Sequence, residues 1–182
     1  MTTVLTPPIK TILIPVDGSV HARKAALVGA AIAVKFGARV VLLHVLLRNT
    51  SLAAIYELAR SQRIPSDVLE RYRTGTPAIY DFGLTIPAGV INPVAPTDLL
   101  VEIGRCILET EKDVIEGQGV TNIVPLIEDG DAANKILEII KKEQADFVVM
   151  GRRGLGALEG MLSGSVSTKV SHLAPTTVVS VT

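Results

Sequence analysis

The stretch ADFVVMGRRGLGALEGMLSGSVSTKV, residues 145–170, joins a short apolar run to a helix-like segment through a turn that is rich in glycine. Residues 151–170 alone hold five glycines, two adjacent arginines and several hydroxyl side chains. Glycine lets another group approach the main chain closely, so this turn faces either another part of the protein or a ligand. Strand, turn and helix in succession form the repeating unit of α/β proteins, which the rest of the chain should then repeat.

Five short apolar runs along the chain predict strands. They cover residues 11–16, 39–46, 122–128, 146–151 and 176–181. Each run is nearly continuous rather than alternating, which predicts burial on both faces and therefore helices on both sides of a parallel sheet. Aromatic residues make up only 3% of the chain, so Val, Ile, Leu and Ala must fill the core.

Helical segments alternate with these runs. Ser19 and Gly37 predict the two ends of the first helix, Pro96 and Gly117 bound a longer one, and Pro175 stops the last. The segment 131–144 places one buried face at helical spacing, formed by Ala133, Ile136, Leu137 and Ile140. The alternation predicts an open, doubly wound, five-stranded parallel sheet in a single α/β domain that spans residues 1–182.

Residues 48–96 form an insertion in this pattern. Residues 51–63 and 66–73 can each form a short amphipathic helix, and residues 76–96 form an arm rich in proline and glycine. The arm is too apolar for simple disorder, so we interpret it as packing on its own domain or on a second subunit. A surface loop that covers its own apolar residues is the alternative.

Charge and cysteine content limit the partners and the compartment. The 18 basic residues balance the 18 acidic ones, so no net charge draws the protein to nucleic acid or to a membrane. One cysteine excludes an internal disulfide, and neither a leader nor an apolar run of about 18 residues is found. The expected localisation is cytoplasmic.

Two polar stretches follow predicted strands, where parallel sheets bind ligands. Asp17 and Gly18 come after the first strand, and the glycine-rich turn comes after the fourth. Gly164 and Ser165 open the last helix, whose unpaired amides and positive dipole end suit an anion such as phosphate, with Ser167 as a further donor. The alternative is that the glycines serve packing and that Ser165 only caps the helix.

Several familiar site patterns are missing from the chain. No G-x-x-x-x-G-K-[ST] loop occurs, and the G-x-G-x-x-G that begins at Gly154 is broken by Glu159. The three histidines and one cysteine have no metal-ligand spacing, and no G-x-S-x-G nucleophile elbow occurs. His44 lies inside an apolar run and is expected to be a packed core residue.

Two motifs together resemble the ATP-binding universal stress proteins. Gly151, Gly154, Gly164 and Ser165 match the family signature G-2x-G-9x-G-[S/T], and ILIPVDGS at residues 12–19 is typical of the family's first strand. The resemblance covers residues 9–47 and 97–182 and implies a Rossmann-like, adenine nucleotide α-hydrolase-like fold with strand order 3-2-1-4-5.

The resemblance also implies the site and its ligand. ATP, or ADP or AMP, would be bound with Mg²⁺ or Mn²⁺ held by the phosphates rather than by protein ligands. The nucleotide-binding residues carried over from the family are Pro15, Val16, Asp17, Val45, Met150, Gly151, Arg153, Gly154, Gly164, Ser165, Val166 and Ser167. A homodimer through residues 176–181 is implied as well, and the arm at 76–96 offers a second contact.

These features favour a nucleotide-dependent regulatory protein with at most slow ATP hydrolysis. No residue is placed as an obvious base for water attack, so no catalytic residue is assigned, although Asp17 or a metal hydroxide could support a slow reaction. Two alternatives stay open. One is an adenine nucleotide hydrolase-type enzyme, which usually carries an S-G-G-x-D-S loop that VDGSVH lacks. The other is an interaction module that acts through the arm without nucleotide.

Overall fold

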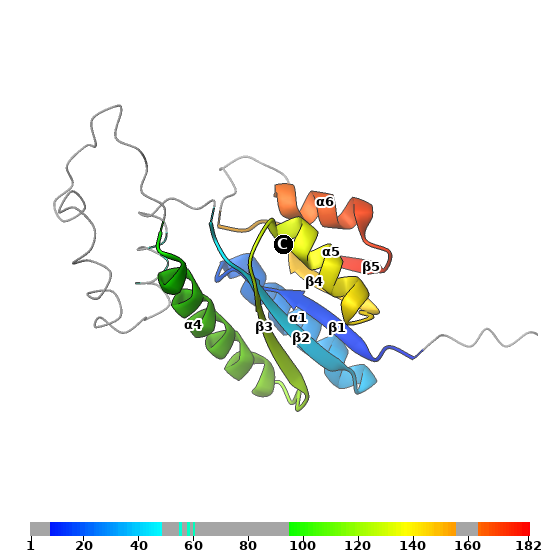
Figure 1. The fold of residues 1–182 in the computed structure, drawn as a ribbon. Coiled ribbons are helices and arrows are strands. Elements are labelled where there is room, and N and C mark those ends of the chain that lie inside the picture. Colours follow the sequence, from blue (N-terminus) through cyan, green and yellow to red (C-terminus); the bar gives the residue numbers. More distant parts are fainter. Residues whose placement is uncertain (1–7, 49–54, 56–57, 59, 61–94, 156–163) are drawn as a thin grey trace, which may run out of the picture.

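The computed structural model describes residues 8–48, 55, 58, 60, 95–155 and 164–182. They form a five-stranded parallel sheet in the order β3-β2-β1-β4-β5, with helices on both faces (Figure 1). In chain order the elements are β1 (Thr11–Pro15), α1 (Val20–Phe36), β2 (Arg39–Val45), α4 (Thr97–Glu116), β3 (Ile123–Glu128), α5 (Ala132–Lys142), β4 (Phe147–Gly151), α6 (Ser165–Leu173) and β5 (Thr177–Val181).

The predicted fold class and strand order are confirmed. β1 pairs with β2 on one side and with β4 on the other, so the winding direction reverses between β1 and β4. In register, Pro15 lies opposite Leu43 and Leu13 lies opposite Val148. In such sheets the carboxyl ends of the two strands at the reversal enclose a ligand crevice.

The core consists of two apolar layers, one on each face of the sheet. Ile12 and Ile14 point into a layer covered by α1 and α4, whereas Leu13 points into a layer covered by α5 and α6. The alternation arises because successive side chains of a strand face opposite sides of the sheet. All three side chains are fully buried.

The prediction that all five strands are buried on both faces is wrong for the two edge strands. β1 and β2 are almost wholly buried, but residues of β3 and β5 are partly or fully exposed. An edge strand has a neighbour on one side only, and the helices cover it less completely.

Helix ends lie where the sequence predicted. The Ser19 side chain accepts a hydrogen bond from Ala22 N at the start of α1, and Gly37 ends that helix in the left-handed conformation. The buried face of α5 differs in one position from the prediction, because Ile139 is buried whereas Leu137 is only partly buried.

Most of the insertion lies outside the described residues, including the predicted helix at 66–73 and residues 76–94 of the arm. Three residues of the first predicted helix are described, and all three are helical. Ile55 and Leu58 are buried in the layer under α1 and α4, as an amphipathic helix requires.

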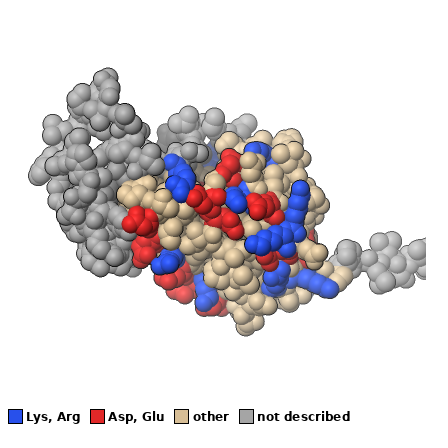
Figure 2. Space-filling view, viewed as in Figure 1, with Lys and Arg blue, Asp and Glu red and all other residues tan. Residues whose placement is uncertain are grey.

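The described surface carries both signs of charge. In Figure 2, basic and acidic side chains are interspersed over the visible face, in agreement with the balanced composition. Within the described part of the chain, no helix is both long and apolar enough to span a membrane.

Candidate functional site

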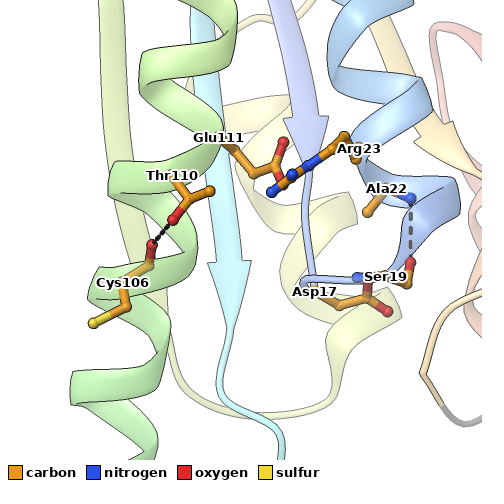
Figure 3. A network of polar contacts seen from close by, with 7 residues as sticks. All are labelled: Asp17, Ser19, Ala22, Arg23, Cys106, Thr110 and Glu111. Carbon is orange, nitrogen blue, oxygen red and sulfur yellow. Dashed lines mark hydrogen bonds and ion pairs between the residues drawn. The ribbon is translucent and has the colours of Figure 1, made fainter. Parts of the chain in front are cut away.

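Asp17 follows β1 at the reversal of the sheet and holds two segments in place. Its Oδ1 accepts a hydrogen bond from Ser19 N at 3.0 Å, and its Oδ2 accepts one from Leu155 N, also at 3.0 Å. Gly18 makes the turn between Asp17 and Ser19 possible, since its φ of +84° lies in the left-handed region. Figure 3 shows Asp17 and Ser19 at the start of α1. One carboxylate therefore links the ends of β1 and β4.

Gly154 has no side chain where Asp17 needs room. A Cβ at this position would lie 2.4 Å from Asp17 Oδ2. Any larger residue would displace the carboxylate from Leu155 N. The structure thus brings together Asp17 and Gly154, two predicted site residues that lie near opposite ends of the chain.

Gly151 serves packing between a strand and a helix. It is the last residue of β4, and a Cβ there would lie 2.8 Å from the His21 carbonyl carbon and 3.0 Å from Ala22 N. Both are main-chain atoms of α1 or its start, so they cannot move without moving the helix. The alternative that the glycines serve packing is therefore correct for Gly151, while its contact with a nucleoside stays a prediction.

The glycine-rich turn is closed at its base. Arg152 O accepts a hydrogen bond from Gly164 N at 2.9 Å and another from Ser167 Oγ at 2.7 Å. Ser167 is buried, and its Oγ also lies 3.0 Å from Gly164 O. In this structure the Ser167 hydroxyl is directed to the main chain of the turn, and its contact with a phosphate stays a prediction. The residues at the two ends of the glycine-rich turn, Arg152 and Gly164, are therefore hydrogen-bonded neighbours.

The start of α6 is open. Gly164 is the N-cap residue, with ordinary extended dihedrals, φ −74° and ψ 153°, and as a glycine it offers no side chain to cap the helix. Within the described ranges, the atom nearest to a Cβ at Gly164 would be Arg152 O at 3.5 Å, which is normal contact. The first main-chain bond of the helix runs from Thr168 N to Gly164 O. The amides of Ser165 and Val166 precede that bond and have no acceptor within the helix.

Other predicted site residues lie around the same edge. Val16, Val45 and Met150 are buried in the two core layers, so a ligand could reach only their main chains. Pro15 ends β1 and is half-buried, as is Arg153. The assignment of the base contact near Val45 to the main chain is consistent with this burial.

His44 is fully buried, as expected, but it is more than a packed core residue. Its Nδ1 lies 2.9 Å from Val16 O, the carbonyl just before Asp17. Burial lowers the pKa of the imidazole, and this effect exceeds the opposing influence of the Val16 hydrogen bond and the Asp17 charge. The signal in the sequence was one polar residue inside the apolar run 39–46.

A buried carboxylate also escaped sequence analysis. Glu111 of α4 is 1% exposed, and its Oε1 pairs with Arg23 Nη2 of α1 at 2.9 Å (Figure 3). This ion pair holds α4 against the first turn of α1. A charged residue on the apolar face of 97–116 was the available signal.

An exposed ion pair lies beside the carboxyl ends of β2 and β3. Arg48 donates to both carboxylate oxygens of Asp129, and it also donates to Thr97 at the start of α4. The pairing raises the pKa of Arg48 and lowers the pKa of Asp129. These contacts tie the exit of β2 to the turn after β3.

A cavity of about 570 Å³ lies at the opposite end of the sheet, lined in part by Pro8, Asp146 and Pro175. Asp146 is already engaged, since its Oδ2 accepts hydrogen bonds from Lys10 N and Thr11 N. Open parallel sheets generally bind ligands at the carboxyl ends of their strands, so we assign the site to the Asp17 edge. Among the described residues, no group of three or more acidic, histidine or cysteine side chains could hold a metal ion.

The strand order and the paired turns after β1 and β4 define an adenine nucleotide α-hydrolase-like fold of the doubly wound class. The chain belongs to the universal stress protein family, whose model matches residues 8–182. A universal stress protein of Thermus aquaticus is 30% identical over 169 residues, which cover 91% of this chain and 93% of that protein.

Solved structures share the fold at lower identity. The universal stress protein UspA of Lactobacillus plantarum aligns with a TM-score of 0.63 at 18% identity, covering 97% of this chain and all of that one. A universal stress protein of Archaeoglobus fulgidus in complex with dAMP gives 0.60 at 15% identity, over 96% and 99% of the two chains. A further universal stress protein, solved in complex with cAMP, gives a TM-score of 0.57 at 19% identity, over 96% of this chain and 97% of that one.

Proposed function

We propose that this protein binds ATP in the crevice between the ends of β1 and β4 and acts as a nucleotide-dependent regulatory protein. The base and ribose would lie against Asp17 and the main chains of Val16 and Val45. The phosphates would lie against Gly164 and the amides that follow it. Mg²⁺ or Mn²⁺ would be held by the phosphates and water, as is usual for such ions.

One observation carries this proposal: the described part of the structure does not require a glycine at position 164. Its dihedrals suit any residue, and the nearest atom that a Cβ would meet among the described residues is Arg152 O, at 3.5 Å. By contrast, α1 and α5 are capped by the side chains of Ser19 and Asp131. A bare main chain at a helix start leaves amides for an anion and removes the Cβ from its path.

Two related structures support an adenine nucleotide as the ligand. The A. fulgidus protein was crystallised with dAMP and a further family member with cAMP. The chain adds Arg153 beside the turn and the open amides of α6, which suit a longer phosphate chain. We infer ATP from these groups together with the signature glycines.

A regulatory role fits the site better than rapid catalysis. Both oxygens of Asp17 already accept main-chain hydrogen bonds, so this carboxylate is employed in holding the two turns together. We therefore assign no catalytic residue and expect hydrolysis to be slow at most. ATP would change the surface formed by the glycine-rich turn.

We further propose that the protein forms a homodimer through the free edge of β5. β5 pairs with β4 on one side, and within the described residues nothing pairs with its other side. Pairing with a second copy would satisfy the main-chain groups of that edge.

The test compares nucleotide content and affinity in the parent and in Gly164→Val. Protein purified without added nucleotide is denatured, the released small molecules are separated by chromatography, and ATP, ADP and AMP affinities are measured by calorimetry. We expect the parent to bind an adenine nucleotide near one per chain. The variant should bind at least about tenfold more weakly, because loss of one charge-assisted amide contact costs about that much.

Gly117→Ala at the end of α4 is the control far from the site: it adds a Cβ to a glycine next to a helix end, 3.3 Å from Asp113 O. Thermal unfolding of all proteins establishes that they are folded; the altered cap of Gly164→Val should cost no more than about 1 kcal/mol. If the folded Gly164→Val protein retains nucleotide as the parent does, the phosphate site is wrongly placed. If the parent binds none, the interaction-module alternative is favoured.

A further inference from the structure

We propose that His44 is a positioning residue for the nucleotide site: its buried imidazole holds the Val16 carbonyl and so directs Asp17 toward the glycine-rich turn. The expected effect of His44 on nucleotide affinity rests on the proposed nucleotide site. The expected effect of His44 on the glycine-rich turn does not depend on any ligand.

The hydrogen bond defines the state of the imidazole. A carbonyl oxygen only accepts, so His44 Nδ1 must carry the hydrogen that bridges the 2.9 Å to Val16 O. Nε2 is then the bare nitrogen. It is buried and has no hydrogen-bond partner among the described residues. A site that served only packing would more readily take a leucine or valine, because an unpaired buried nitrogen is costly.

The bond lies where the sheet releases the chain. Pro15 and Leu43 form the last residue pair between β1 and β2. One residue further, Val16 N still donates a hydrogen bond to Leu43 O at 2.8 Å. The His44 side chain then takes the carbonyl of the same residue. Val16 is thus held to β2 at both its amide and its carbonyl.

The next residue is the one whose direction matters. Asp17 reaches Ser19 N with one oxygen and Leu155 N with the other, each at 3.0 Å. A rotation of the Val16–Asp17 peptide would swing the carboxylate away from Leu155. The two hydrogen bonds of Val16 and the two of Asp17 form a continuous path from β2 through the end of β1 to the turn after β4.

The helix α4 is adapted to admit the imidazole. A Cβ at Gly104 would lie 2.7 Å from His44 Cδ2 and 3.3 Å from Nε2. Glycine inside a helix is destabilising relative to alanine. Gly104 is buried in the middle of α4, so the helix accepts this cost where His44 needs the space.

Two substitutions separate positioning from packing. His44→Leu keeps the bulk but has no donor. His44→Asn carries an amide N–H at about the place of Nδ1 and should restore the bond to Val16 O. We expect both proteins to fold. The leucine variant removes the unpaired Nε2 but also leaves Val16 O without its donor, and these two effects on stability oppose each other.

The first readout needs no nucleotide: exchange of the Leu155 amide hydrogen, followed by NMR. In His44→Leu this amide should exchange at least about fivefold faster than in the parent, since its acceptor is no longer held in place, and His44→Asn should restore most of the protection. Unchanged exchange in His44→Leu would overturn the proposal, as would equal exchange rates in the leucine and asparagine variants.

The second readout is the affinity for ATP. We expect a loss of about tenfold in His44→Leu with partial recovery in His44→Asn, the size expected when one buried hydrogen bond no longer orders the site. Equal affinities in folded parent and folded His44→Leu would also overturn the inference. If the parent binds no ATP, the proposed function fails, and the exchange experiment alone decides the role of His44.

Discussion

At the scale of single residues, His44 stands inside the sheet as a neutral group. Burial lowers the pKa of its imidazole, whereas the Val16 carbonyl and the Asp17 charge raise it by less. The unfolded chain has no such burial, so there the same group titrates near its ordinary pKa of 6.5. The two states therefore bind different numbers of protons in acid.

This difference predicts how stability depends on pH. Below pH 6.5 the unfolded state takes up a proton that folded His44 resists, so the free energy of unfolding should fall as the pH falls. The slope from this one group is at most about 1.4 kcal/mol per pH unit. Urea denaturation at pH 7.0, 6.0 and 5.5 measures it.

His44→Leu provides the comparison, because it removes the titrating group and leaves the other ionisable residues unchanged. The variant should lose less stability than the parent over the same pH interval. Parallel curves for the two proteins would mean that His44 is protonated in the folded state as readily as in the unfolded one.

At the scale of secondary structure elements, glycine has two separate roles in the turn after β4. Gly151 lets the end of β4 approach α1, whereas Gly164 leaves the start of α6 uncovered. The same family signature thus contains one residue needed by the fold and one that the fold does not need. A pair of alanine substitutions distinguishes the roles.

Gly151→Ala should destabilise the protein by about 1–3 kcal/mol, because its Cβ would overlap main-chain atoms at 2.8 and 3.0 Å. Gly164→Ala, whose Cβ would lie 3.5 Å from Arg152 O, its nearest neighbour in the described part of the chain, should cost no more than about 1 kcal/mol but still weaken nucleotide binding. Chemical denaturation of both variants measures the difference. Equal loss of stability would show that α1 can move away from β4.

At the scale of the whole molecule, the free edge of β5 decides assembly. Val181 O accepts a hydrogen bond from Arg152 N, so the main-chain groups of Val181 face β4. Those of Ser180 face the other way, because neighbouring residues of a strand point in opposite directions. Ser180 therefore presents its amide to the proposed partner.

Ser180→Pro should convert the proposed dimer to a monomer, since proline removes that amide and leaves the pairing with β4 in place. Light scattering on the eluting protein should give about twice 19.3 kDa for the parent and a single chain mass for the variant. Ser180→Ala, which keeps the amide, should remain dimeric. A monomeric parent would contradict the interface, and so would a dimeric, folded Ser180→Pro protein.

Sequence alone predicted the architecture because it depends on local patterns. Continuous apolar runs, helix caps such as Ser19 and Gly37, and the alternation of strands with helices fixed the parallel sheet. The family motifs added the order 3-2-1-4-5. They also located the edge at which Asp17 and Gly154 meet, 137 positions apart in the chain.

Tertiary structure decided what each of those residues contacts. The hydroxyl of Ser167 turns inward to Arg152 O, Gly151 packs on α1, and His44 reaches Val16 O across two strands. Such contacts depend on the direction of a side chain after the sheet has assembled, and neither periodicity nor spacing encodes that direction. The chain pattern therefore specified where the site lies, and packing specified how it is held.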